Sequence, residues 1–547
     1  MTEEIQDIFD EIRNIMQPDM DCTARYHALD ALLLRALKDR TRHSPVDFTH
    51  TAARLHWLCK QTGHPSHPLE VFRARAGRIQ KGLFLPDGED EAYDLKAVCE
   101  GLAAFYQTHV PEDVQKRLPR HWRPAPAPAE KVPQAKRIRI TVHRWDEHFI
   151  YGKDHTHPTE QLLKVEYTDE TDRTFADLKE QLYEGAQLNL LSVKTIKAEG
   201  AYPYVLKPEM LVLDPDFLID ITALCACIKP YGYSAYTHLL NKFAPPARSA
   251  AIQLGNAANQ FLDDCVNENR DLERAKTSEN EVFRLGSAER ERFIQNRDLE
   301  REDRACPESA GRERFIQNAD GTAEAELYLR SMQNSFRISP LAWSTLPDID
   351  RDFFNRCEMQ FRHIRQTVRN SFSAAGIDIR KTEVELEPSF LCEALGLQGR
   401  MDLLTRNADK LVELKSGKAD EYPYRSPKDE HRLQMALYKE ILYYNLDRRH
   451  EQVQSYLFYS RYPGLYAVDV PRSHIRRVMA LRNAILHIEH RLRRGESRAL
   501  IGELTEERLN VDGRGDRLYT RYLRPRMMEI LTPLHGMRGA EADYFHR

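Results

Sequence analysis

The sequence contains no long apolar run. Nowhere in its 547 residues is there an apolar stretch of about eighteen, the minimum for a helix that crosses a bilayer. The chain starts with MTEEIQDIFDEI, which is acidic and lacks the apolar core of a signal peptide. These absences predict a soluble protein that is not secreted and has no membrane partner.

A disulfide framework is missing as well. The cysteines are odd in number, nine, and follow no regular spacing. This pattern predicts reduced thiols in a cytosol-like compartment. They stand at positions 22, 59, 99, 225, 227, 265, 306, 357 and 392.

The chain also has no excess of positive charge. It carries 80 Lys and Arg against 84 Asp and Glu, which gives a formal net charge of −4. A nucleic-acid-binding role would therefore depend on local basic patches. Apolar residues are present in sufficient number, 41%, to build real cores under a very polar surface.

The length predicts about three or four domains, and the residue patterns predict a multidomain α+β protein. Apolar residues at three- and four-residue spacing predict helices at the start, and Pro-Ala alternation then predicts a stiff linker. A period of two predicts a small β-barrel or curled sheet, interrupted by a short helix at FADLKEQLYEG. In order, the segments are a helical N-terminal domain (1–122), the linker (123–136), the β-rich domain (137–230), a mixed α/β region (231–470) with a charged helical insertion (266–330), and a helical C-terminal segment (471–547).

The stretch LQGRMDLLTRNADKLVELKSGK carries the clearest chemistry. Two short apolar runs flank TRNADK, which predicts a hairpin of antiparallel strands. Alternation along the second strand places Glu413 and Lys415 on one face and Val412 and Leu414 on the other. The hairpin can bring Asp402 beside Glu413.

Two adjacent carboxylates repel each other unless a divalent cation holds them together. Lys415 would supply positive charge where a phosphodiester transition state accumulates negative charge. Asp402, Glu413 and Lys415 therefore favour metal-assisted phosphodiester hydrolysis. The other interpretation is an ordinary surface ion pair, because Glu-x-Lys is common on exposed strands.

The helix predicted at HRLQMALYKEILYYNL bears on that choice. His431, Gln434 and Tyr438 fall on one helical face, where they would meet the strand or a bound nucleic acid. Such a stripe can equally be a boundary between core and solvent. We also expect Arg400 and Arg461 to contact nucleic acid, and Glu383 and Glu387 to add acidity to the site. The basic helix predicted at RCEMQFRHIRQTVRNSF and the arginine-rich helix at 472–498 are further candidates for DNA contacts, although each can equally be a solvated helix face.

These motifs, Gly-Arg-Met-Asp-Leu-Leu, Glu-Leu-Lys-Ser-Gly-Lys and Gln434-x-x-x-Tyr438, together resemble the PD-(D/E)XK nucleases of the RecB type. The resemblance implies a restriction-endonuclease-like core at 231–470. It also implies that Asp402 and Glu413 bind Mg²⁺ or Mn²⁺ and that Lys415 supports catalysis. Gln434 and Tyr438 would organise the site and the DNA strand.

The upstream motif departs from this family. Its members usually have Gly-x-x-x-His, whose histidine binds the metal, whereas here Gly255 is followed four residues later by Asn259. An asparagine oxygen can bind Mg²⁺ or Mn²⁺, so Asn259 is our third candidate metal ligand. A plain surface asparagine fits the pattern nearly as well.

The passage LVLDPDFLIDITALCACIKP is similar to one in flap-processing helicase–nucleases of DNA replication and repair. The similarity implies an OB-like barrel before the nuclease and an iron–sulfur cluster with three cysteines after it. No cysteine follows Cys392, so we expect no cluster, with Cys225 and Cys227 as ordinary thiols.

The resemblance to this family implies that the protein is a metal-dependent deoxyribonuclease that acts on single-stranded DNA ends or flaps in repair, replication or defence. We expect it in the cytoplasm, associated with the nucleoid if bacterial. The chain has no Gly-x-x-x-x-Gly-Lys-Ser/Thr loop, so a helicase motor would follow residue 547 or be a separate polypeptide. The main alternative is an inactive nuclease-fold subunit that binds DNA and recruits or regulates a helicase. A scaffold that docks through the N-terminal helices is a third.

Overall fold

The computed structural model shows a mixed α/β protein that divides into two compact units. It describes residues 3–536 except 18–19, 45, 47, 49, 123–134, 199–200, 231, 244–248, 285–318, 347, 378, 380–383, 421–424 and 512–518. The first unit comprises Met1–Ala244, Leu391–Gln398 and Arg472–Arg547, and the second comprises Pro245–Phe390 and Gly399–Pro471. No helix in the described part of the chain is long and apolar enough to span a membrane.

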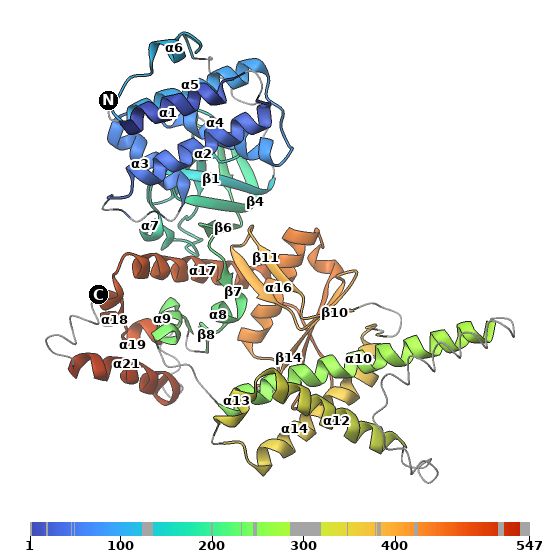
Figure 1. The fold of residues 1–547 in the computed structure, drawn as a ribbon. Coiled ribbons are helices and arrows are strands. Elements are labelled where there is room, and N and C mark those ends of the chain that lie inside the picture. The colour runs from blue at the N-terminus through green and yellow to red at the C-terminus, as the bar shows by residue number, and fades with distance from the viewer. Residues whose placement is uncertain are drawn as a thin grey trace. The chain divides into compact units, whose positions relative to one another are not determined.

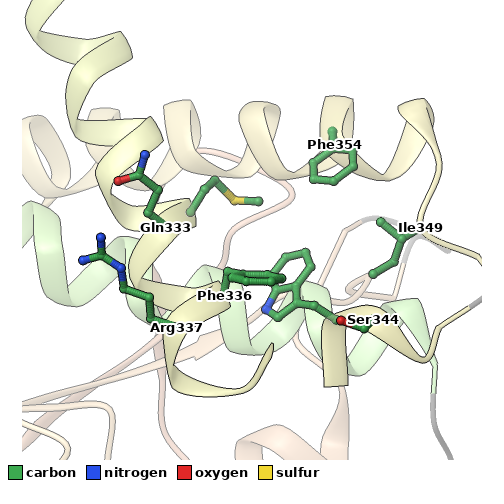
Figure 2. A pocket seen from close by; sticks show the side chains of 8 residues that line it. Gln333, Phe336, Arg337, Ser344, Ile349 and Phe354 are labelled. Atoms are coloured by element: carbon green, nitrogen blue, oxygen red, sulfur yellow. The ribbon is translucent and has the colours of Figure 1, made fainter. Parts of the chain in front are cut away.

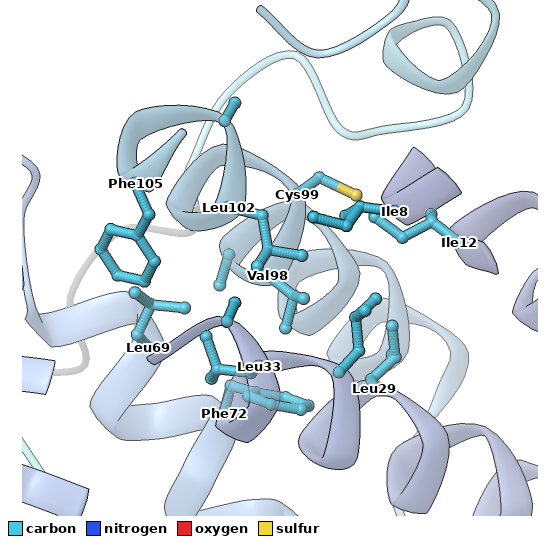
Figure 3. Packing of buried hydrophobic residues seen from close by; sticks show 14 of the residues in the cluster. Ile8, Ile12, Leu29, Leu33, Leu69, Phe72, Val98, Cys99, Leu102 and Phe105 are labelled. Carbon is cyan, nitrogen blue, oxygen red and sulfur yellow. The ribbon is translucent and has the colours of Figure 1, made fainter. Parts of the chain in front are cut away.

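The first unit begins with the predicted helical domain. Its helices are α1 (Glu3–Ile15), α2 (Cys22–Arg40), α3 (Thr51–Thr62), α4 (His67–Gln80), α5 (Gly88–Phe105) and α6 (Glu112–Gln115). Their apolar stripes meet in one core, where Leu33, Phe72 and Val98 are fully buried (Figure 3). Helices α4 and α5 cross closely at Gly101, because a Cβ there would lie 2.8 Å from Leu69 Cδ1.

A closed β-barrel follows, as the period of two predicted. Its strands are β1 (Ala135–Trp145), β2 (Phe149–Asp154), β3 (Leu163–Glu166), β4 (Gln187–Lys197) and β5 (Tyr204–Lys207). They pair in the order β1-β2-β3-β5-β4, and β4 closes the barrel by pairing back to β1. The predicted short helix is α7 (Leu178–Gln181), and β6 (Met210–Leu213) extends the sheet beside β4. The predicted linker lies mostly outside the described residues.

The rest of the first unit includes segments from the end of the predicted β-rich domain, from the start of the predicted α/β region and from the predicted C-terminal segment. These are β7 (Ile219–Asp220), α8 (Ile221–Cys225), β8 (Ile228–Lys229), β9 (Gly232–Tyr233), α9 (Ala235–Phe243), α17 (Arg472–Arg493), α18 (Ser497–Gly502), α19 (Glu506–Leu509), the π-helix Tyr519–Leu523 and α21 (Arg524–Gly536). Helix α17 packs against β6 and α9, so residues before and after the α/β region share one unit.

The second unit is built on a mixed sheet of five strands. The order is β10 (Val384–Leu386), β13 (Leu403–Thr405), β14 (Lys410–Lys415), β15 (Gln454–Tyr459) and β16 (Tyr466–Val468). Only the β14–β15 pair is parallel among the pairs of this sheet. The strands β11 (Ser389–Cys392) and β12 (Leu397–Arg400) lie where the chain passes between the units.

Helices pack against this sheet (Figure 1). The helices α10 (Ala250–Arg284), α12 (Ala319–Ile338), α13 (Pro340–Ser344) and α14 (Arg351–Gln366) share a core with the sheet. Val412 and Leu414 of β14 point into that core. Because side chains alternate along a strand, Glu413 points to the opposite face, where α16 (Asp429–Leu446) meets it through Gln434. Residues 285–318 of the predicted charged insertion lie outside the described residues.

Candidate active site

The predicted hairpin places the first two acidic residues together. Strands β13 and β14 pair antiparallel, with Leu403 opposite Val412. Asp402 immediately precedes β13, and its Oδ2 accepts a hydrogen bond from the backbone N–H of Leu414 at 2.6 Å. Asp402 therefore lies beside Glu413, as the sequence predicted.

Glu413 is buried, with 4% of its surface exposed, and its two oxygens have different surroundings. Oε1 accepts hydrogen bonds from Lys415 Nζ at 2.8 Å and from Gln434 Nε2 at 2.7 Å. Oε2 is buried and has no hydrogen-bond partner among the described residues. An unpartnered carboxylate oxygen is costly to bury, so Oε2 is the atom in this site that most needs a cation.

Asp402 is affected by the charges of Glu413 and Lys415. It is partly exposed yet densely surrounded by protein atoms. Burial, followed by repulsion from Glu413, raises the pKa of the Asp402 carboxyl well above its ordinary value, although Lys415 opposes the shift. The ion-free protein therefore tends to keep a proton on this carboxyl, and a divalent cation would compete with that proton.

Gln434 and Tyr438 hold the carboxylates in place from α16. Gln434 Nε2 contacts Tyr438 Oη at 3.0 Å as well as Glu413, and Tyr438 Oη donates to the Arg400 carbonyl at 2.7 Å. Both side chains are buried, at 3% and 1% exposure. In this structure they are positioning residues, because one orients Glu413 and the other anchors the backbone two residues before Asp402.

Helix α10 passes the end of β14 at the glycine of the upstream motif. A Cβ on Gly255 would lie 3.3 Å from Ser416 Oγ, next to Lys415. Asn259 is one turn further along α10 and half-buried, and Asp263 follows it at the next four-residue step on the same face. Helix α10 therefore carries a carboxylate that we did not predict, Asp263, one turn beyond Asn259.

Asp263 lies in strongly acidic surroundings. Burial, then repulsion from Glu387 and Asp264, raises the pKa of Asp263 to about 7, while Arg400 acts in the opposite direction. Glu387 also raises the pKa of Asp402, so it acts on both Asp263 and Asp402, while Glu383 lies outside the described residues. The sequence signal was available: in LGNAANQFLDD, Asp263 continues the helical stripe from Gly255 through Asn259.

The structure shows the surroundings of the residues that we predict to contact nucleic acid. The Arg400 side chain is 57% exposed and pairs with Glu387 at 3.1 Å, beside the acidic cluster. His431 Nδ1 lies 2.8 Å from Tyr459 Oη, at the end of β15. Arg461 is exposed just after β15.

The arginine-rich helix α17 is largely occupied within the first unit. Arg482 is completely buried and donates to the carbonyls of Leu213, Phe217 and Gly396. Arg476 donates to the Glu209 carbonyl at 2.7 Å. A basic helix in the sequence was thus not sufficient to identify a DNA-binding face.

Two other features offer no competing site. A hollow of about 410 Å³ is lined by Met332, Gln333, Phe336, Arg337, Trp343, Ser344, Ile349 and Phe354 (Figure 2). These residues include no carboxylate, imidazole or thiol, so they offer no acidic or strongly ligating group to a metal. Cys225 and Cys227 are buried thiols, and burial raises the pKa of Cys227 to about 12.

The donor set at the hairpin fits a hard divalent cation. Asp402 and Glu413 contribute carboxylate oxygens, which Mg²⁺ and Mn²⁺ prefer. Glu413 Oε2 has no partner in the described structure, and Asp402 is not fully enclosed. Comparisons of the sequence with models of known protein families and with curated proteins find no match.

Proposed function

We propose that this protein is a metal-dependent DNA nuclease that hydrolyses phosphodiester bonds at the site formed by Asp402, Glu413 and Lys415. The observation that carries the proposal is the buried, unpartnered Oε2 of Glu413 beside an Asp402 carboxyl whose pKa is raised. Two carboxylates in this arrangement destabilise each other without a cation. An inactive nuclease-fold subunit would have little reason to retain that cost together with Lys415.

Asp402 and Glu413 would hold Mg²⁺ or Mn²⁺, which supplies an activated water and neutralises charge on the phosphate. Lys415 reaches the same edge of β14 and keeps its ammonium 2.8 Å from Glu413 Oε1. From there it can turn toward a phosphate oxygen and stabilise the negative charge that develops there. Gln434 keeps Glu413 in one rotamer by donating to Oε1, so Oε2 stays directed at the cation.

Asp263 and Glu387 would extend the acidic site toward α10. Asp263, with its pKa of about 7, is suited to exchange a proton at neutral pH. Arg400 pairs with Glu387 at the exposed edge of this cluster and would meet the phosphate backbone of a substrate.

Single-stranded DNA is the proposed substrate. The support is the closed five-stranded barrel of the first unit, whose strand order is that of barrels that bind oligonucleotides. Its first three strands carry cations over aromatic rings: Arg144 over Tyr151 at 3.7 Å and Lys164 over Phe149 at 3.8 Å. Tyr151 is buried, so the exposed Arg144 and the half-buried Lys164 and Phe149 are the groups here that could contact phosphates and bases. A helicase motor in cis or in trans would supply the strand.

The test is cleavage of labelled single-stranded, double-stranded and flap DNA by the full chain with Mg²⁺ or Mn²⁺. We expect cleavage of the strand with a free end, reduced by roughly a hundredfold or more in Asp402→Asn, Glu413→Gln and Lys415→Met. Lys410→Met is the matched control, because Lys410 begins the same strand but pairs with Asp409. No cleavage with either metal, or full activity in Lys415→Met, would contradict the proposal.

A further inference from the structure

A second group of metal-ligating side chains lies in the first unit, far along the sequence from the hairpin. His56 of α3, Glu70 of α4 and His143 of β1 each offer one ligand atom, and these atoms lie within 4.8 Å of one another. It is the only such group of three or more His, Cys, Asp or Glu side chains among the described residues. All three side chains are half-buried, so solvent ions can reach them.

The two imidazoles already stand at the spacing of zinc ligands. His56 Nε2 lies 3.2 Å from His143 Nδ1, and the rings are at 81° to each other. With Zn–N bonds of about 2.0–2.1 Å, two nitrogens of a tetrahedral site are separated by about 3.3 Å. Glu70 faces the other nitrogen of His143, Nε2, so an ion bound by all three residues would take one nitrogen of His143 and replace the contact that this nitrogen now makes.

Glu70 is held as a third ligand. Its Oε2 accepts from Lys153 Nζ at 2.9 Å, while Oε1 accepts from Ser66 Oγ at 3.0 Å and lies 3.5 Å from His143 Nε2. Lys153 and Ser66 thus fix the carboxylate from outside, as outer partners of metal ligands commonly do.

The imidazoles also have nitrogen atoms that lack a hydrogen bond. His56 Nδ1 and His143 Nε2 are buried and make no hydrogen bond to any residue that the structure describes, although Glu70 Oε1 lies 3.5 Å from His143 Nε2. Lys153 is the main unfavourable charge nearby, and its pairing with Oε2 leaves Oε1 for the ion.

We propose that His56, Glu70 and His143 bind one Zn²⁺ ion, which joins helices α3 and α4 to strand β1 of the barrel. This site is independent of the nuclease site, because it uses two imidazoles and one carboxylate where Asp402 and Glu413 offer oxygen only. Three protein ligands leave a fourth position for water.

The experiment uses the full chain carrying Asp402→Asn and Glu413→Gln, so that the hairpin does not contribute metal binding. The protein is stripped with EDTA, exchanged into chelator-free buffer and titrated with Zn²⁺ against a chromophoric chelator. We expect one Zn²⁺ per chain and an affinity at least tenfold weaker after His56→Gln or His143→Gln. His64→Gln is the matched control, since His64 is a nearby imidazole whose Nε2 is likewise buried without a described partner.

Two further measurements separate ligation from folding. Zinc K-edge absorption should report two imidazole nitrogens, and saturating Zn²⁺ should raise the melting temperature of the parent but not of His56→Gln. His56→Gln is the informative variant because the described hydrogen bond of its ring is the one to His143. No bound Zn²⁺, or equal affinity in the parent and both histidine variants, would overturn the proposal.

Discussion

At the scale of single residues, the two oxygens of Glu413 explain why a carboxylate and an ammonium lie on a strand that is otherwise apolar. Oε1 is satisfied by Lys415 and Gln434, whereas Oε2 is buried without a described partner. A solvent-exposed ion pair would leave neither oxygen buried and would contribute little to stability. These surroundings support our proposal that the Lys415–Glu413 pair is half of a cation site.

The raised pKa of Asp402 leads to a stability prediction. A carboxyl whose pKa is higher in the folded than in the unfolded state destabilises the protein as the pH rises from the unfolded-state pKa toward the folded-state pKa. In that range the folded state binds more protons than the unfolded state, so raising the pH favours unfolding. Asp402→Asn should therefore raise the free energy of unfolding by about 1–3 kcal/mol at pH 8 in EDTA, and by less at pH 5. Thermal or urea unfolding at the two pH values measures both.

The matched control for this prediction is Asp409→Asn in the same hairpin. Burial opposes ionisation of Asp409, but hydrogen bonds from Thr405 and Lys410 outweigh it and lower its pKa. Removing that charge should destabilise the protein by about 1 kcal/mol at pH 8. If Asp402→Asn destabilised the metal-free protein in the same way as Asp409→Asn, the carboxylate pair would not be strained.

Residue patterns were sufficient to predict that Asp402, Glu413 and Lys415 lie close together, because a hairpin and strand alternation fix their relation locally. They were not sufficient for Asp263, which approaches the site from a helix more than a hundred residues earlier in the chain. That approach depends on how α10 packs against β14. We predicted Asn259 as a metal ligand from a family motif, whereas the same face of the helix carries Asp263 one turn further along.

At the scale of elements, α16 fixes the site through one hydrogen-bond chain. The chain runs from Glu413 through Gln434 and Tyr438 to the Arg400 carbonyl. It joins the strand that carries Glu413 to the backbone that leads into Asp402. Loss of one link should therefore loosen both carboxylates without removing either.

Tyr438→Phe tests this link. The variant lacks the hydroxyl that contacts Gln434 and donates to Arg400, so we expect a loss of about 1–2 kcal/mol in stability, because the carbonyl loses its donor. Cleavage should fall by roughly tenfold, much less than in Lys415→Met. Tyr456→Phe is the control, since the Tyr456 hydroxyl only reaches Gln454 two residues away. Unchanged stability and cleavage in Tyr438→Phe would show that the chain of hydrogen bonds is dispensable.

The elements themselves were predictable where one period dominates. The N-terminal helices, the barrel strands, the hairpin and α16 all follow from spacing of apolar residues. Pairing between distant strands was not predictable, such as the parallel β14–β15 pair or the return of β4 to β1. Helix α17 shows the same limit: its arginines suggested DNA contacts, yet Arg482 is buried among backbone carbonyls.

At the scale of the whole molecule, the chain contains two units that each enclose a core of their own. The hairpin, α10 and α16 lie in the second unit, while the barrel and the proposed zinc site lie in the first. The boundaries cross the predicted domains because α17 and residues 391–398 belong with the first unit. Sequence patterns describe consecutive segments, so they could not show a unit assembled from three separated parts.

At this scale, the position of the acidic residues matters as well as the net charge of −4. The acidic residues gather locally as Asp263, Glu387, Asp402 and Glu413, which repel one another and would repel DNA without cations. Divalent ions would thus be needed for substrate binding as well as for chemistry.

The most direct test of the central claim is an anomalous-difference map from crystals of the full chain grown or soaked with Mn²⁺. We predict a peak between the carboxylates of Asp402 and Glu413, with Glu413 Oε2 at about 2.0–2.3 Å from the ion. The peak should be absent in Glu413→Gln crystals treated in the same way. A wild-type map at saturating Mn²⁺ with no peak at this pair would contradict the account.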